Sequence, residues 1–182
     1  MTTRFISALA IVCCCAVSSA FAQDASSSAP YVPTPRTAVN TIYAELLGNA
    51  GLYSLNYERM LQDNFGLRIG ASYFGFNAAA GGSSAAVSLV SFPLMANYFV
   101  GTEASRLELG LGLLLANGSA SVVSSGSSSS SGGFGASLTS TIAYRLQPPQ
   151  GGFNFKIGAT PSFSLATGTF QLWGGISAGF GF

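Results

Sequence analysis

The sequence contains no histidine, and its only cysteines, Cys13, Cys14 and Cys15, stand side by side near the amino terminus. Without histidine the chain cannot build a Ser-His hydrolase or a histidine metal site. The sequence also lacks a glycine-rich phosphate motif between a strand pattern and a helix pattern, which leaves nucleotide binding without support. These absences predict a protein that is not an enzyme and that holds no cofactor and no metal.

Charge is scarce as well. Charged residues make up 7% of the chain, against about 25% in an ordinary soluble domain. The net charge of +1 gives no argument for a nucleic-acid partner. The chain is apolar enough for lipid, yet past the amino terminus no stretch reaches the ~18 apolar residues of a membrane helix. The best candidate, residues 107–116, is too short and contains Glu108. Since only helices and closed barrels satisfy their backbone groups in lipid, these features favour a β-barrel.

Residues 1–22 have the pattern of a secretory signal peptide. Arg4 supplies the positive start, residues 5–17 are apolar, and Ala20-Phe21-Ala22 is a small-x-small cleavage site. All three cysteines fall inside this segment, so the mature chain is expected to have no disulfide. Residues 23–39, which carry several serines and prolines, are predicted to form a mobile segment ahead of the folded domain.

Residues 40–182 show eight strand patterns separated by turn signals. The expected strands are residues 40–47, 52–61, 65–76, 86–100, 106–116, 134–146, 153–164 and 171–182. Their typical length is about ten residues, which is what a tilted strand needs to cross a bilayer. The predicted fold is therefore all-β, a closed antiparallel up-and-down transmembrane barrel of eight strands. An even number of strands places both termini on the periplasmic side.

The connections sort accordingly into two sets. Short turns are expected on the periplasmic side, at residues 62–64, 101–105 and 147–152. Outward loops are expected at residues 48–51, 77–84, 117–133 and 165–170. The longest of them, residues 117–133, consists almost entirely of serine and glycine and is expected to be mobile.

In the fourth expected strand the apolar residues do not all fall on the same face. Val87 and Leu89 share one face, but the apolar residues after them share the other. A β-bulge at residues 91–93 would reconcile the two halves. Because proline cannot donate to a ladder, one ladder bond is expected to be missing at Pro93 and another at Pro161.

Most charged side chains of the strands have inward parity. They are Glu45, Glu58, Arg68, Arg106, Glu108, Arg145 and Lys156. A buried charge must be paired, so these residues are predicted to form a salt-bridged plug in the lumen. A charged gate or ion path and a proton-transfer dyad are the alternatives. If the second hairpin turns at Asp63, Glu58 lies directly across from Arg68, and the two are expected to pair. Arg59 has outward parity at a strand end, where it can snorkel to the interface.

Residues 43–59 resemble the first hairpin of small outer-membrane barrel proteins of Gram-negative bacteria, of the eight-stranded OmpA/OmpX type. The uncharged final strand, with Ile176 and Phe180 on one face and Phe182 at the carboxyl terminus, resembles the strand that the barrel-assembly machinery reads. The resemblance implies a cell outer-membrane location, with residues 23–39 in the periplasm. It also implies outer-membrane lipid and the assembly machinery as partners.

Several functions remain open. The first is a monomeric structural or surface-interaction barrel that displays its Ser/Gly loops, whose partner the sequence does not reveal. The second is a narrow pore for small or apolar solutes, because glycine and small polar residues recur on the inward face. A lipid-modifying enzyme is weaker without histidine. A soluble ligand-binding barrel would need its apolar face inside.

Overall fold

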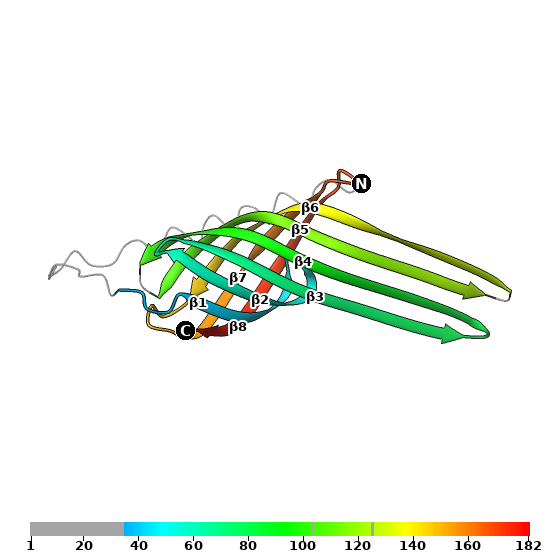
Figure 1. The fold of residues 1–182 in the computed structure, drawn as a ribbon, viewed down its shortest axis with the longest axis horizontal. Helices are drawn as coiled ribbons and strands as arrows, with labels where there is room; N and C mark the ends of the chain where they lie inside the picture. Colours follow the sequence, from blue (N-terminus) through cyan, green and yellow to red (C-terminus); the bar gives the residue numbers. More distant parts are fainter. Residues whose placement is uncertain (1–34, 103, 125) are drawn as a thin grey trace, which may run out of the picture. The chain divides into compact units, whose positions relative to one another are not determined.

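The computed structural model describes residues 35–102, 104–124 and 126–182, and these form a closed barrel of eight antiparallel strands (Figure 1). The strands are β1 (Asn40–Gly48), β2 (Gly51–Gln62), β3 (Phe65–Ala80), β4 (Ser83–Thr102), β5 (Ser105–Ser124), β6 (Ser127–Leu146), β7 (Gly152–Ser164) and β8 (Phe170–Gly181). Each strand pairs with the next, and β1 pairs with β8 to close the sheet. The predicted fold class is confirmed. The expected signal peptide and residues 23–34 lie outside the described residues.

Along the barrel strands, polar side chains point into the interior and apolar side chains point outward, which is the reverse of a soluble protein. On β2, Tyr53, Leu55 and Tyr57 are exposed, whereas Asn56 and Glu58 are buried. The buried residues of the barrel are mostly polar or charged, and the exposed ones are mostly large and apolar. Within the described ranges no helix is long and apolar enough to cross a membrane.

Residues 37–39 already belong to the folded part of the chain, just ahead of β1. The backbone N–H groups of Thr37 and Ala38 both donate to the carbonyl of Pro149, and that of Met60 donates to the carbonyl of Val39. Ala38 is buried. Residues 37–39 are therefore held at the end of the barrel where β1 begins and β8 ends.

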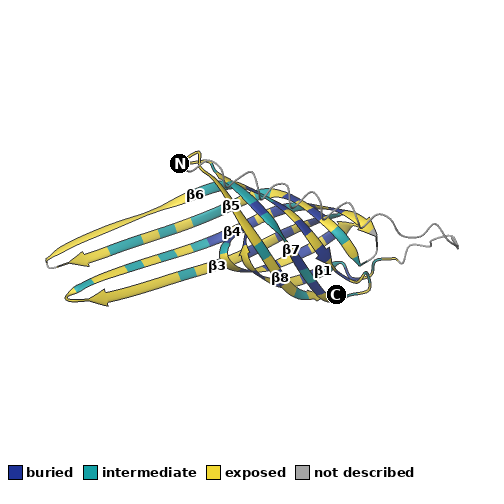
Figure 2. Ribbon diagram, turned by 180° about the vertical axis from the view of Figure 1, so that it is seen from behind, coloured by how far each residue is buried: buried dark blue, intermediate teal, exposed yellow. Residues whose placement is uncertain are grey.

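Four adjacent strands run past the others at the opposite end (Figures 1 and 2). β3 to β6 have 16 to 20 residues, whereas β1, β2, β7 and β8 have 9 to 13. β2 pairs with β3 only as far as Ala71, and β7 pairs with β6 only as far as Ser137. We call residues 72–91 and 116–135, which continue beyond these points, the protruding sheet.

The expected loops at residues 77–84 and 117–133 are therefore wrong. Pairing continues to Ala80 and Ser83 in the first hairpin and to Ser124 and Ser127 in the second. Gly81 and Gly82 both have positive φ, which a two-residue hairpin turn requires. Small polar residues have low strand propensity, but pairing with neighbouring strands overrides it here.

The predicted bulge at residues 91–93 is also wrong. β4 has the same register with β3 on both sides of Pro93, and a single register with β5 along its whole length. The phase change that Val87 and Leu89 suggested coincides instead with the point where β4 leaves the barrel.

The missing ladder bonds at the two prolines are confirmed. The β3–β4 ladder is interrupted opposite Pro93, which still pairs with Leu114 on β5. The β6–β7 ladder is interrupted opposite Pro161, which still pairs with Leu172 on β8. Each proline is thus accommodated by losing pairing on one side only.

Candidate functional site

Six charged residues meet inside the barrel and form what we call the interior cluster. They are Glu45, Glu58, Arg68, Glu108, Arg145 and Lys156. Every side chain is 4% exposed or less. Three carboxylates face three cations, so the formal charges of the cluster cancel. Burial of this many charges is tolerable because each has an opposite partner.

The ion pairs run as one continuous chain. Arg68 pairs with Glu45, and Lys156 lies 3.5 Å from Glu45 and 3.1 Å from Glu108. Arg145 lies 3.1 Å from Glu108 and also pairs with Glu58 at the end of the chain. Lys156 and Arg145 therefore each bridge two carboxylates.

The expected pair between Glu58 and Arg68 does not form, although the two residues are directly opposite each other in the β2–β3 ladder. The side chains diverge along the barrel axis. Arg68 donates from Nε to Asn56 at 2.9 Å, one inward position toward the protruding sheet. Glu58 accepts from Asn97 at 2.7 Å, one inward position toward the termini, and pairs with Arg145. Side-chain direction, which register does not specify, decides the partners.

Tyr43 lies among the three cations and was not predicted from the sequence to belong to the cluster. Its ring centre lies 4.7 Å from Lys156 Nζ, 5.4 Å from Arg68 Cζ and 5.9 Å from Arg145 Cζ. Lys156 also donates to its hydroxyl at 3.3 Å. The negative face of the ring thus adds to the neutralisation of the three cations. Inward parity between Thr41 and Glu45 was the available signal.

Arg106, predicted to belong to the lumen network, lies at the rim near the termini instead. It is half-buried and donates to the backbone carbonyl of Asp63. Arg36 lies nearby: burial, with the positive charges of Arg106 and Arg145, lowers the pKa of its guanidinium to about 10. This end of the interior is therefore lined by arginines beyond the cluster itself.

The β1–β2 turn, expected as an outward loop, folds into the barrel and covers the cluster from the other side. Asn49 and Ala50 are each 4% exposed. Asn49 Nδ2 donates to Thr139 Oγ1 at 2.7 Å, and Asn49 Oδ1 accepts from Thr141 at 2.9 Å and from Arg68 at 3.1 Å. The turn thus spans the interior from β1 and β2 to β6. Within the described ranges, no group of His, Cys, Asp and Glu residues is arranged to hold a metal ion.

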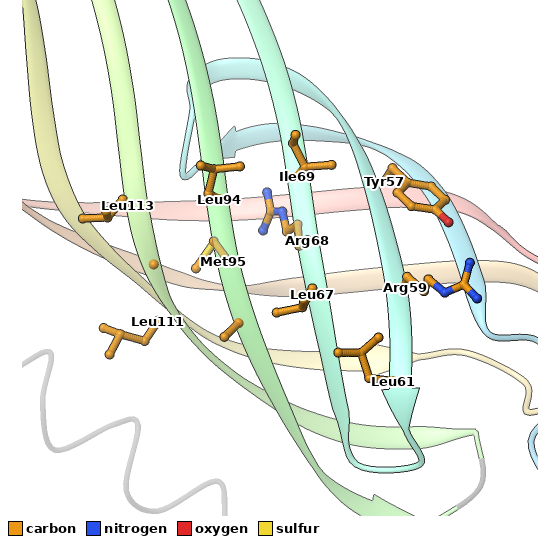
Figure 3. A pocket seen from close by; sticks show the side chains of 12 residues that line it. Tyr57, Arg59, Leu61, Leu67, Arg68, Ile69, Leu94, Met95, Leu111 and Leu113 are labelled. Atoms are coloured by element: carbon orange, nitrogen blue, oxygen red, sulfur yellow. The ribbon is translucent and has the colours of Figure 1, made fainter.

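A second feature is a groove of about 600 Å³ on the outward face of β2 to β5. Figure 3 shows its leucine and isoleucine side chains on β2, β3, β4 and β5, with Arg59 at its edge. A third is a cavity of about 170 Å³ at the mouth of the barrel, between the inward turn and the base of the protruding sheet.

The carboxyl-terminal strand closes the barrel. Ile176, Phe180 and Phe182 are all exposed on the outward side. The backbone of Phe182 exchanges two hydrogen bonds with that of Asn40, at 2.8 and 2.9 Å. The last residue therefore contributes to the seam between β8 and β1.

These features define a class, the eight-stranded up-and-down barrels of the outer-membrane type, and the chain has this fold. No family model and no curated protein sequence matches the chain. Among solved structures, Ail, the attachment invasion locus protein of Yersinia pestis, is 17% identical, with a TM-score of 0.54 over 80% of this chain and 97% of Ail. The N-terminal β-barrel domain of Pseudomonas aeruginosa OprF is also 17% identical, with a TM-score of 0.50 over 79% of this chain and 95% of that domain. Ail in complex with the heparin analogue sucrose octasulfate gives a TM-score of 0.53.

Proposed function

We propose that the protein is a non-catalytic outer-membrane barrel that presents the protruding sheet at the cell surface for interaction with other molecules. The observation that carries the proposal is the continuation of β3 to β6 beyond the other four strands. Ail, a protein of the same fold, is named for attachment and invasion, which agrees with this proposal.

The outward face fits a lipid environment. Exposed leucine, isoleucine and aromatic side chains surround the barrel, and the groove in Figure 3 is almost wholly apolar. Arg59 lies near the end of β2 where the termini meet, so its guanidinium can reach the headgroups of the periplasmic leaflet. The protruding sheet then extends from the opposite, extracellular side.

The interior argues for a closed barrel. The interior cluster fills one part of it, and the inward turn at Asn49 lies across the next part. An eight-stranded barrel has an interior just wide enough to be filled by side chains. A solute would therefore have to displace several buried ion pairs, and we favour surface interaction over a pore.

The surface that interacts is uncharged. Residues 72–91 and 116–135 contain no lysine, arginine, aspartate or glutamate. Ail has been solved in complex with a heparin analogue, but electrostatic capture of such a sulfated ligand is not proposed for this uncharged sheet. The proposed partner contacts are made by small polar and apolar side chains.

The test removes the protruding sheet and leaves the barrel. Residues 74–89 and 118–133 are each replaced by Asn-Gly, which joins Tyr73 to Val90 and Asn117 to Phe134 across existing rungs. We expect the shortened protein to keep its resistance to cold SDS and its mobility shift on boiling. Bacteria that display it should adhere less to host cells or abiotic surfaces than those displaying the full protein. Equal adhesion, or steady conductance of the full protein in a planar bilayer, would overturn the proposal.

A further inference from the structure

The two faces of the sheet exchange polarity where it leaves the barrel. Inside the barrel the inward face is polar. In the protruding sheet the same face is apolar across β3, β4 and β5 over three rungs, which are Phe74–Leu89–Gly118, Phe76–Val87–Ala120 and Ala78–Ala85–Val122. On β6 these rungs continue with Gly133, Ser131 and Ser129. The opposite face becomes polar, with Ser88 and Ser119 hydrogen-bonded at 2.8 Å. Phe76 and Val122 are more than half exposed, so the apolar face is uncovered in the isolated chain.

The apolar face leads directly into the cavity at the mouth of the barrel. Leu89 belongs to both, and Leu114, Ala116 and Trp173 form further apolar walls. Uncharged polar groups complete the lining, among them the side chain of Gln171. The described residues that line the cavity include no charged side chain. Below it, the turn at Asn49 separates it from the interior cluster.

We propose that this mouth cavity is a binding site for an uncharged, mainly apolar small molecule, about the size of one aromatic ring or a short alkyl chain. Its volume of about 170 Å³ is close to the ~150 Å³ of an engineered apolar cavity that binds benzene. A charged ligand would lose its hydration without gaining a counter-ion, which the lining does not supply. A hydroxyl or carbonyl group could be bonded by Gln171 or by neighbouring serine and threonine side chains.

The apolar face of the protruding sheet then has a role of its own. It offers a continuous apolar surface from the solvent down to Leu89, along which such a molecule can approach the cavity. The inference needs only the folded barrel and does not depend on the proposed surface interaction. Loss of adhesion and loss of ligand binding are therefore separate results.

Trp173 is the only tryptophan of the chain and lines the cavity, which makes the site visible by fluorescence. The probe is 4-bromobenzyl alcohol, whose bromine quenches tryptophan on contact, with 4-bromobenzoate as the charged counterpart. We expect saturable quenching by the alcohol and at least tenfold weaker quenching by the benzoate. Equal quenching by both, or a linear response without saturation, would overturn the proposal.

Two matched variants separate the cavity from the surrounding detergent or lipid. Ala116→Phe fills the cavity and should reduce affinity for the alcohol at least tenfold. Ala96→Phe makes the same change on the outward face and should leave it unchanged. Resistance to cold SDS shows that each variant is folded. If Ala116→Phe does not fold, Leu89→Gln provides the test, and unchanged affinity in the folded cavity variant would contradict the site.

Discussion

At the scale of single residues, Arg145 joins Glu58 to the interior cluster, because it pairs with both Glu58 and Glu108. Arg145→Met keeps much of the volume but leaves Glu58 without its ion-pair partner and Glu108 paired with Lys156 alone. Breaking a buried ion pair in this way costs about 3–5 kcal/mol. We expect a correspondingly lower free energy of unfolding in urea titrations in lipid vesicles. Arg59→Gln, an exposed control, should change it by less than about 0.5 kcal/mol. Similar unfolding midpoints for the two variants would mean that water already solvates the cluster.

Gly179 is one of several glycines that leave room for neighbouring groups inside the barrel. A Cβ at Gly179 on β8 would overlap Tyr43 and the backbone oxygen of Ile42. Gly179→Ala should therefore lower stability by roughly 1–3 kcal/mol, as overpacking does. Gly174→Ala on the same strand is the control, since the nearest atom lies 3.9 Å from its added Cβ. Equal urea midpoints for these two alanine variants would contradict the packing around Tyr43.

Sequence parity predicted the inward side of the cluster residues but not their partners. Alternation fixes the face of a residue such as Glu58, because the strand period is two. It does not fix whether a long side chain extends up or down the barrel axis, and this direction joined Arg68 to Glu45 rather than to Glu58. Parity also placed Tyr43 on the inward face, but an uncharged aromatic side chain gives no signal in the sequence that it contacts the cations.

At the scale of elements, the protruding sheet is where composition misled the prediction. Residues 117–133 are serine- and glycine-rich, which is typical of a loop, yet residues 117–124 pair with residues 127–134. The boundaries of β1, β2, β7 and β8 were predicted to within one or two residues, because large apolar residues alternate with polar or small ones there and turn residues flank them. In the extensions the alternation is weak and reversed in sense, so periodicity gave no usable signal.

Hydrogen exchange distinguishes a paired sheet from a loop. In β4 and β5 of the protruding sheet, both neighbours are strands, so consecutive amides should be protected. In β6, residues 127–135 have only β5 as a neighbour, so alternate amides should exchange fast. Residue-resolved NMR exchange rates would show this contrast. Uniformly fast exchange of the amides from residue 117 to residue 133 would show that this segment is a loop.

At the scale of the whole molecule, Phe182 extends the seam between β8 and β1 by two backbone hydrogen bonds. Removing Phe182 deletes two backbone hydrogen bonds to Asn40 and an exposed aromatic side chain. We expect much less SDS-resistant barrel in cells from this deletion than from Phe170→Ala, which removes an exposed aromatic at the other end of β8. Immunoblots of unboiled outer-membrane fractions measure the difference. Equal amounts would mean that the terminal residue is dispensable for assembly.

The exchange of polarity along β3 and β4 also sets the depth at which the barrel sits in a bilayer. The outward apolar face runs from Phe65 to Tyr73, and beyond it the outward residues become small and polar. Eight residue steps at about 3.4 Å each, tilted by about 40°, span ~20 Å, close to the ~25 Å apolar band of such barrels. This is shorter than the ~30 Å hydrocarbon core of an average membrane, and the bacterial outer membrane is thinner than average. The protein should therefore insert more readily into short-chain lipids than into long-chain ones, so that membrane thickness itself selects where it resides.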